Sequence, residues 1–229
     1  MDFNKIYNVI LAESKNQNDP KVFLKELLDF YNFIYRKIGS VAVQYGKGTH
    51  PKHRVTKYHD FFVENIGKNE SVIDLGSGRG DVTYDVSKKT TNEVLGIEMN
   101  ANNLTYARNT YKNDNLKFSY GNIHGDIPSR HFDVVILSNV LEHLDRRDDL
   151  LRDIIKKITP FKVLLRVPYF ERDWTVPVKK ELGVNYFLDN THKIEYRQEE
   201  FFAEMERSGL KVDSMKVNWG EIWAVCKNF

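Results

Sequence analysis

From Ser71 onward, short apolar runs alternate with segments whose apolar residues recur at helical spacing. The run at residues 134–137 is apolar without alternation, which is typical of a strand buried on both faces of a sheet. Strands are predicted at residues 72–75, 94–97, 116–120, 134–138 and 163–167, with helices at 80–88, 101–111 and 146–158. This alternation predicts an α/β fold with a mostly parallel sheet and helices on both of its faces.

The end of the chain follows a different pattern. A helix is predicted at residues 199–208, followed by strands at 210–217 and 221–226. The Asn-Trp-Gly sequence at 218–220 leaves room only for a tight, hairpin-like link between these strands. A mostly parallel sheet that ends in a hairpin must contain one antiparallel strand.

The first third of the chain is predicted to be helical. Asp19 followed by Pro20 is a typical helix start, and the apolar residues between 23 and 38 fall on one helical face. We expect this helix to end at Gly39 and a second one to cover residues 55–66. The prediction is therefore an N-terminal helical extension with a basic loop over 1–54, followed by the α/β domain at 55–229.

Composition adds several exclusions. The 229 residues carry a net charge of only +2, which predicts neither a nucleic-acid partner nor an anionic membrane surface. The single cysteine, Cys226, excludes an internal disulfide framework and a cysteine-rich metal site. No signal pattern or long apolar run is present, so a cytoplasmic protein without a membrane contact is expected.

The clearest candidate site is the glycine-rich turn after the first predicted strand. Gly76 and Gly78 allow a sharp turn and a close approach of backbone to ligand, and Ser77 lies between them. Glu98 ends the next strand, where a carboxylate can accept hydrogen bonds from both hydroxyls of a ribose. Asp74 precedes the turn and suits the cationic amino group of a bound amino acid.

Two other interpretations of this turn stay open at this point. One is a strand-to-helix loop that binds no ligand. The other is a dinucleotide site of an oxidoreductase, but the Gly-x-Gly-x-Gly spacing differs from the dinucleotide pattern. Asp74 would also repel a pyrophosphate, which disfavours the dinucleotide.

These residues resemble the motifs of class I S-adenosylmethionine-dependent methyltransferases, from about Val72 to the C-terminus. Residues 74–80 are similar to the first motif, and residues 96–99 to the second, in which Met99 would pack against adenine. Gly-Asn-Ile at 121–123 resembles the third, which implies that Asn122 and Ile123 border the adenine edge, although the family more often has an acid at the position of Asn122. Residues 132–144 are close to the fourth motif of the generic small-molecule, type 11-like branch.

The resemblance implies a Rossmann-like fold with an antiparallel seventh strand. It also implies S-adenosylmethionine as cofactor and S-adenosylhomocysteine as product. Asn139, just past the carboxyl end of a central strand, is expected at the methionine end of the cofactor or as a turn-stabilising amide. His143 follows in the same motif, where the Glu-His pair either buttresses the loop or takes part in catalysis.

Two further segments are candidates for substrate binding. Residues 45–59 contain four basic side chains and three histidines without an acid, so Lys47, His53 and Arg54 are candidates to bind an anion. A solvated basic loop is the alternative, and no metal site is expected there because no cysteine or acid is close. Residues 168–197 are rich in aromatics, Trp174 among them, and are too long for a simple connection. They predict a substrate lid, with a structural subdomain or a dimer contact as the alternatives.

The predicted reaction is methylation of a small molecule. His192 and Tyr196 could face the acceptor. His192 is the first candidate for a general base, and His143 is the second. The sequence motifs of DNA amine, cytosine-C5 and protein arginine methyltransferases are missing, and O-methylation of a sugar or anionic metabolite is slightly favoured. An NAD(P)-dependent oxidoreductase, a non-catalytic cofactor-binding module and basic RNA or protein acceptors stay open, as does the choice between monomer and homodimer.

Overall fold

The computed structural model describes residues 2–16 and 19–229. The chain divides into two compact units, which we treat separately. The sheet unit comprises residues 52–172 and 187–229, and the helical unit comprises residues 1–51 and 173–186. The chain first passes from one unit to the other between residues 51 and 52, close to the predicted boundary between residues 54 and 55. Residues 173–186 fall within residues 168–197, which were predicted as a lid.

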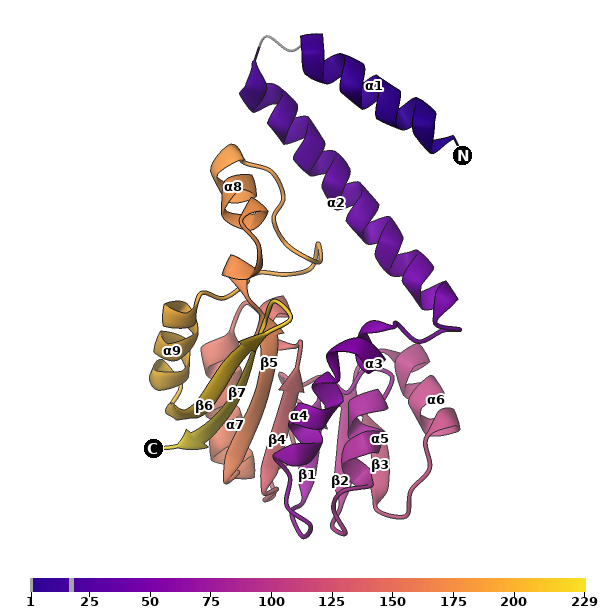
Figure 1. The fold of residues 1–229 in the computed structure, drawn as a ribbon. Coiled ribbons are helices and arrows are strands. Elements are labelled where there is room, and N and C mark those ends of the chain that lie inside the picture. Colours follow the sequence, from indigo (N-terminus) through magenta and orange to yellow (C-terminus); the bar gives the residue numbers. More distant parts are fainter. Residues whose placement is uncertain (1, 17–18) are drawn as a thin grey trace. The chain divides into compact units, whose positions relative to one another are not determined.

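The sheet unit is built on a single sheet with strand order β3-β2-β1-β4-β5-β7-β6 (Figure 1). Strands β1 to β5 are parallel, and β7 pairs antiparallel with both β5 and β6. The strands are β1 Val72–Leu75, β2 Val94–Glu98, β3 Leu116–Tyr120, β4 Val134–Ser138, β5 Lys162–Pro168, β6 Leu210–Asn218 and β7 Glu221–Asn228. The predicted Rossmann-like fold with its antiparallel last strand is confirmed.

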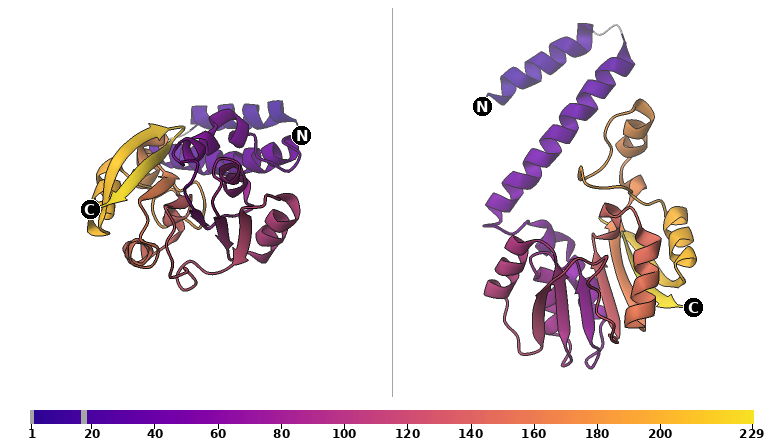
Figure 2. Two further views of the ribbon diagram at one scale, coloured as in Figure 1. Left: turned by 90° about the horizontal axis from the view of Figure 1, so that it is seen from below. Right: turned by 180° about the vertical axis from the view of Figure 1, so that it is seen from behind.

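Helices cover both faces of this sheet (Figure 2). Side chains alternate along β4, so Val135 and Leu137 pack with α7 and α9 while Val134 and Ile136 pack with α4 and α5. Both faces are therefore buried, which explains the continuous apolar run in the sequence. The helices of this unit are α3 Lys52–Thr56, α4 Tyr58–Glu64, α5 Asp81–Ser87, α6 Ala101–Thr110, η1 Leu141–His143, α7 Arg147–Ile158, η2 Phe170–Arg172 and α9 Gln198–Arg207.

The helix predicted at residues 55–66 is instead two helices, α3 and α4. Lys57 separates them and has a φ of 53°, which no α-helix can propagate because that conformation is left-handed. The bend brings the ring of His53 on α3 to 5.2 Å from that of Tyr58 and 5.1 Å from that of His59 on α4. The sequence contains no glycine at this break, and the prediction of one continuous helix was wrong.

The helical unit contains α1 Phe3–Asn16, α2 Pro20–Tyr45 and α8 Thr175–Leu182. The start of α2 is the predicted one, since the Asp19 carboxylate accepts a hydrogen bond from the Lys21 backbone N–H. The helix continues through Gly39, where an added Cβ would meet no atom within 4 Å. The predicted end at Gly39 was wrong, because a glycine inside a helix costs only about 1 kcal/mol and does not by itself stop it.

Contacts between α2 and the segment around α8 join the two parts of the helical unit. The Asn32 amide donates a hydrogen bond of 2.6 Å to the Asn185 carbonyl, and the Lys179 ammonium lies 4.5 Å above the Tyr31 ring. Along α1 and α2, Leu28 is the one residue that the structure describes as buried. Apolar packing within this unit is therefore sparse. None of the described helices, α2 included, is long and apolar enough to cross a membrane.

Candidate functional site

The glycine-rich turn after β1 is held in left-handed conformations. Gly76 has a φ of 78° and Gly78 a φ of 55°, values that residues with a side chain rarely adopt. A Cβ added to Gly76 would lie 2.8 Å from a methyl carbon of Val140, so packing fixes this glycine. A Cβ added to Gly78 would meet nothing within 4 Å, which leaves its face of the turn open to a ligand.

Glu98 is bound to this turn by hydrogen bonds. Its carboxylate accepts from the Gly78 N–H at 2.8 Å and from the Asn100 N–H at 2.6 Å, and only 8% of the residue is exposed. Parallel pairing of β1 with β2 places the carboxyl ends of these strands next to each other. Since each carboxylate oxygen can accept two hydrogen bonds, Glu98 retains acceptor capacity for the hydroxyls of a ligand.

Asp74 lies at the same end of β1 and is 2% exposed. Its Oδ2 accepts a 2.6 Å hydrogen bond from Thr83, whereas its Oδ1 has no partner in the described part of the chain. Burial raises the pKa of Asp74 to about 6, the Thr83 hydrogen bond opposes this rise, and the nearby charge of Glu98 adds to it. A buried carboxylate with an unpaired oxygen is destabilised until a cation or donor reaches it, so this position favours a cationic group.

The third motif lies beside the end of β2, because Glu98 pairs in register with Tyr120 on β3. Ile123 packs in the hydrophobic core and therefore can offer a ligand only its backbone groups. Asn122 is exposed, and its side-chain oxygen accepts a hydrogen bond from the His124 N–H.

Met99 follows β2 and is 61% exposed, which leaves its thioether free to pack against a flat ligand. We call the region from Asp74 to Ile123 that surrounds the glycine turn the cofactor edge.

Asn139 follows β4 in a left-handed conformation with a φ of 56°. Its backbone N–H donates to the Arg166 carbonyl at 2.8 Å, and its buried Oδ1 has no partner among residues 2–16 and 19–229. A strained backbone together with an unpaired buried oxygen is typical of functional positions.

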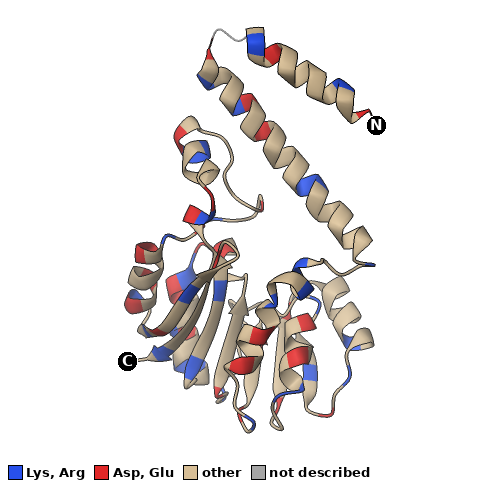
Figure 3. Cartoon of the chain, in the orientation of Figure 1, with Lys and Arg blue, Asp and Glu red and all other residues tan. Residues whose placement is uncertain are grey.

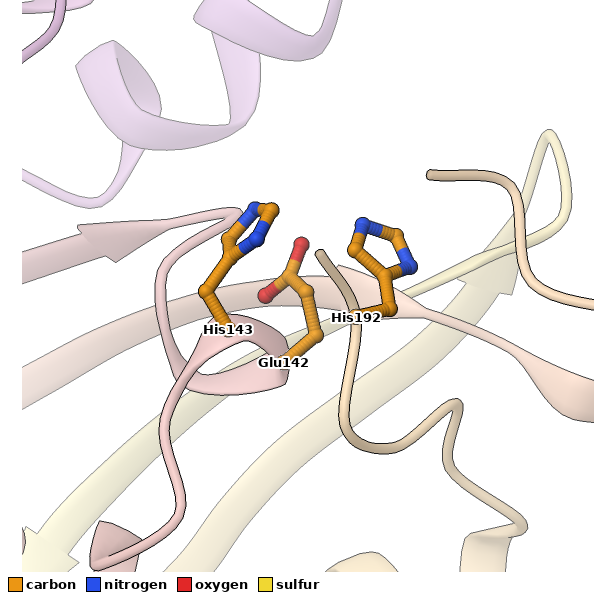
Figure 4. Close-up of side chains that lie close together, drawn as sticks. All are labelled: Glu142, His143 and His192. Atoms are coloured by element: carbon orange, nitrogen blue, oxygen red, sulfur yellow. The ribbon is translucent and has the colours of Figure 1, made fainter. Parts of the chain in front are cut away.

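Glu142 and His143 in η1, which follows β4, form a cluster with His192 from the segment before α9 (Figure 4). Glu142 is 0% exposed, and neither carboxylate oxygen has a hydrogen-bond partner within the described residues. Burial raises the pKa of Glu142 to about 8. The rings of His143 and His192 are 4.8 Å apart, and one ligand atom from each of the three side chains lies within 4.8 Å of the others. We call this cluster the acceptor edge.

Hydrogen bonds fix both imidazole rings of the acceptor edge. His143 Nδ1 lies 2.8 Å from Thr191 Oγ1, and His192 Nδ1 lies 3.2 Å from Glu195 Oε1. The Lys193 backbone N–H donates a 2.7 Å hydrogen bond to the Glu142 carbonyl. The segment that carries His192 is therefore held against η1 by backbone as well as side-chain bonds.

A second polar group lies around the carboxyl end of β5. Arg166 is 3% exposed, forms hydrogen bonds of 2.6 and 2.5 Å with the Glu221 carboxylate, and lies 3.6 Å above the Tyr58 ring. His53 lies 3.1 Å from the nearest nitrogen of His59. Burial lowers the pKa of His53 to about 4, so this ring is neutral at pH 7. A neutral His53 ring could bind a substrate by hydrogen bonding but adds no positive charge, and its predicted role in substrate binding stays a prediction.

Next to His143 is a cavity of about 450 Å³. Its lining includes Asp145, Asp149 and Asp153 against one basic residue, Arg146. This excess of carboxylates does not favour an anionic ligand on that side of the acceptor edge.

Comparison with known proteins identifies the family. Residues 66–210 match a family model described as a methyltransferase domain, which covers more than half of the chain. The chain belongs to this family. The resemblance to class I S-adenosylmethionine-dependent methyltransferases is thereby confirmed, and the cofactor of this methyltransferase is S-adenosylmethionine. The unpaired oxygen of Asp74 and the open face of Gly78 fit its cationic amino acid end and its close approach to the turn.

Named relatives of the methyltransferase differ in substrate. Ribosomal protein L11 methyltransferase of Paraburkholderia phymatum is 31% identical over 104 residues, which are 44% of this chain and 34% of that protein. Ubiquinone/menaquinone biosynthesis C-methyltransferase UbiE of Pectobacterium atrosepticum is 26% identical over 147 residues, which are 61% of this chain and 57% of that protein. The chain therefore spans less than two thirds of the length of these two curated relatives.

A solved structure supports the fold of the methyltransferase. Magnesium protoporphyrin IX methyltransferase from Synechocystis PCC 6803, solved with bound S-adenosylhomocysteine, has a TM-score of 0.63 and 14% identity to this chain. The match covers 91% of this chain and 100% of that one. At this identity the likeness shows a shared fold, and it carries no information about the substrate.

The predicted substrate residues of this chain fall in both units. Lys47 and Trp174 belong to the helical unit, whereas Arg54 is exposed on α3 of the sheet unit. Tyr196 is 0% exposed, and its hydroxyl donates a 2.7 Å hydrogen bond to Glu204. The expectation that Tyr196 faces the acceptor is therefore wrong, because the side chain is part of the hydrophobic core.

Glu142 was not singled out from the sequence as a site residue of its own. The Glu-His pair was expected either to buttress the loop or to take part in catalysis through His143, and the structure brings both residues to His192. A glutamate four residues after an apolar strand and directly before a histidine was the available signal. His143 and His192, which lie 49 positions apart, were predicted separately as candidates for a general base, and their direct contact was not predicted.

Proposed function

We propose that this chain transfers a methyl group from S-adenosylmethionine to an oxygen atom of a small acceptor. In this step a lone pair of the acceptor oxygen attacks the methyl carbon, and the carbon–sulfur bond breaks with its electrons going to sulfur. The products are S-adenosylhomocysteine and the methyl ether or ester, and the hydroxyl proton passes to a base. The cofactor supplies its own leaving group, so the protein has to align the reactants and exclude water.

The observation that carries this proposal is the pair of buried acids on either side of an open glycine turn. In our proposal the unpaired oxygen of Asp74 receives the amino group of the cofactor, and Glu98 accepts hydrogen bonds from its ribose hydroxyls. The backbone of the turn, from Gly76 through Ser77 to Gly78, would pass close to the amino acid portion, which the left-handed φ of both glycines supports. Two separated carboxylates suit a ligand with a cation at one end and a diol at the other.

The remaining cofactor contacts are proposed from position and chemistry. The exposed thioether of Met99 would pack against adenine, and the Asn122 side chain with the Ile123 backbone would bond its edge. Asn139 would orient the methionine end through its unpaired Oδ1.

His192 and His143 are proposed to assist removal of the acceptor proton. Burial lowers the pKa of His143, which keeps its imidazole neutral and able to accept a proton. The Glu195 carboxylate orients the His192 ring in the way that acidic partners orient catalytic histidines. Arg54 remains a proposed substrate contact from α3, and the predicted roles of Lys47 and Trp174 in substrate binding also remain predictions.

Binding measurements and an acceptor screen test this function. Calorimetric titration of the full chain with S-adenosylhomocysteine should show one site, while NADH and NADPH should show none. Binding of only the nicotinamide compounds would instead support an oxidoreductase.

The acceptor screen uses methyl-labelled S-adenosylmethionine with a cell extract divided into small molecules, protein and RNA. Label in an alkali-stable ether or a cleavable ester of a small molecule is the expected result. Label only in protein would contradict the proposed acceptor class, and label on carbon would contradict the proposed acceptor atom.

A further inference from the structure

We propose that Glu142, His143 and His192 bind a divalent transition-metal ion at the acceptor edge. One ligand atom from each side chain lies within 4.8 Å of the other two, and the side chains point toward one another (Figure 4). They come from two segments, η1 and the segment before α9, that a backbone hydrogen bond between Lys193 and Glu142 holds together. The site is therefore built by the fold and does not depend on flexible surface side chains.

Glu142 provides the strongest indication of a cation. The residue is 0% exposed, and both carboxylate oxygens lack a partner anywhere in the described chain. Leaving a buried polar group unsatisfied costs about 1–3 kcal/mol, and more when the group is charged. Two neighbouring imidazoles do not cancel this cost while both are neutral, but an ion bound between the three side chains does.

The outer hydrogen bonds orient the imidazoles as metal ligands. The Thr191 hydroxyl donates its proton to Asp189 at 2.6 Å, so it can only accept from His143, and His143 Nδ1 must carry the hydrogen. The Glu195 carboxylate likewise fixes a hydrogen on His192 Nδ1. Each ring then keeps Nε2 with a free lone pair. Such outer partners are typical of histidines that bind metals.

The ligand set indicates the class of ion. Two imidazoles and one carboxylate suit first-row ions from manganese to zinc and leave coordination positions open, whereas magnesium and calcium prefer oxygen ligands alone. Metal–ligand distances of about 2.1 Å require the three ligand atoms to be about 3–4 Å apart, so binding would draw the side chains together by about 1 Å.

The ion would have a chemical role that rests on the proposed function. When bound beside the acceptor, it would act as a Lewis acid that lowers the pKa of a hydroxyl. His143 and His192 would then act as ligands, and direct proton acceptance by their rings would not be needed. Metal binding itself does not depend on the methyl acceptor and can be measured without it.

Spectroscopy on the full chain tests the proposal. Chelator-treated protein is titrated with Co²⁺ and, separately, with Mn²⁺, and S-adenosylhomocysteine affinity is measured on the same samples. We expect one Co²⁺ per chain with visible d–d absorption, and pulsed electron paramagnetic resonance of the Mn²⁺ form should show couplings to two histidine nitrogens. These couplings come from the unmodified protein, so they do not depend on the folding of a variant.

Substitutions assign the site to the three residues. Glu142→Gln keeps the shape of the side chain but removes its charge. Glu142→Gln and His192→Gln, each as a single variant, should weaken Co²⁺ binding at least about ten-fold. Thr191→Val, which removes the outer partner of His143, should have a similar effect. The matched control His131→Gln changes a histidine that bonds Asp133, outside the cluster, and should leave Co²⁺ affinity unchanged.

The outcomes separate this proposal from the proposed function. Normal S-adenosylhomocysteine binding without stoichiometric Co²⁺ or Mn²⁺ would overturn the metal site and leave the cofactor assignment intact. Co²⁺ binding that survives Glu142→Gln and His192→Gln, or couplings without histidine nitrogen, would also overturn it. Metal binding in a chain that does not bind S-adenosylhomocysteine would instead contradict the proposed function alone.

Discussion

The cofactor edge and the acceptor edge lie in the same unit but are built differently. At the cofactor edge, Asp74, Gly78 and Glu98 lie within 25 consecutive residues, and hydrogen bonds tie the turn directly to Glu98. At the acceptor edge, Glu142 and His192 meet across 50 positions of sequence, and the central carboxylate has no partner within the described residues. The comparison suggests that cofactor binding is encoded locally, whereas the chemistry at the acceptor depends on tertiary structure.

The largest expected effect separates the two edges directly. His192→Ala should reduce turnover by about 10²–10⁴-fold, because it removes an imidazole proposed to assist loss of the acceptor proton. S-adenosylhomocysteine affinity should stay within about three-fold of the original, since no cofactor contact changes. Steady-state kinetics and calorimetry measure the two quantities, with His131→Ala as the control. An equal loss of turnover and of affinity would show that the edges are not separable.

The second prediction concerns cofactor affinity. Glu98→Ala should weaken S-adenosylhomocysteine binding by about 100-fold or more, because charge-assisted hydrogen bonds contribute about 1.5–3 kcal/mol each. Calorimetry gives the affinity, and thermal melting verifies that the variant folds. Glu93→Ala is the matched control, since Glu93 forms an ion pair with Arg130 instead of bonding the turn. An unaltered affinity in Glu98→Ala would rule out the proposed ribose contact.

The glycine turn gives a smaller effect that distinguishes packing from binding. Gly78→Ala places a methyl group where no protein atom lies within 4 Å, so its stability cost should be only the strain of a left-handed residue, about 1–2 kcal/mol. Its affinity for S-adenosylhomocysteine should still fall about ten-fold if the ligand lies against this face. Gly76→Ala should instead lower stability more, because its methyl group would meet Val140. Equal stability losses would contradict this assignment.

The smallest predicted effect is on the pH dependence of binding. The pKa of Asp74 is about 6, and the cofactor's ammonium group pairs with the ionised form. The affinity should therefore be constant well above pH 6 and decrease as pH falls through 6, by up to about ten-fold per pH unit. Asp74→Asn should bind more weakly at pH 8 and lose this dependence. Calorimetry between pH 5 and 8 tests it, and a profile shared by both proteins would exclude Asp74 as its source.

Much of the fold was predictable because its central strands are buried on both faces. The strands at 72–75 and 134–138 occur where the apolar runs predict them, and the hairpin after residue 217 gives the antiparallel strand. The helix ends were less predictable. Gly39 lies inside a helix, because one helical glycine costs only about 1 kcal/mol, and Lys57 breaks a helix through a left-handed conformation that its residue type does not indicate.

The candidate site likewise has residues that the local sequence predicts and residues whose position depends on the fold. Asp74 and Glu98 could be identified from the sequence because their spacing follows from a strand, a turn and a helix. Tyr196 could not be recognised as a core residue, since its segment is mostly polar and its burial depends on α9. The acceptor edge was not predictable as a unit, because its geometry depends on the backbone bond between Lys193 and Glu142.

The helical unit is made of two segments that lie far apart in the sequence, which has a consequence for biosynthesis. Its first part is complete after residue 51, but its second part, residues 173–186, follows 121 residues of the other unit. Asn185 is synthesised 134 residues after residue 51, so at translation rates of about 5–20 residues per second α2 would wait roughly 7–27 s on the ribosome for its contact with Asn185. During that interval its exposed aromatic side chains have no native neighbour from this second part, and chaperone binding to the nascent chain would be expected there.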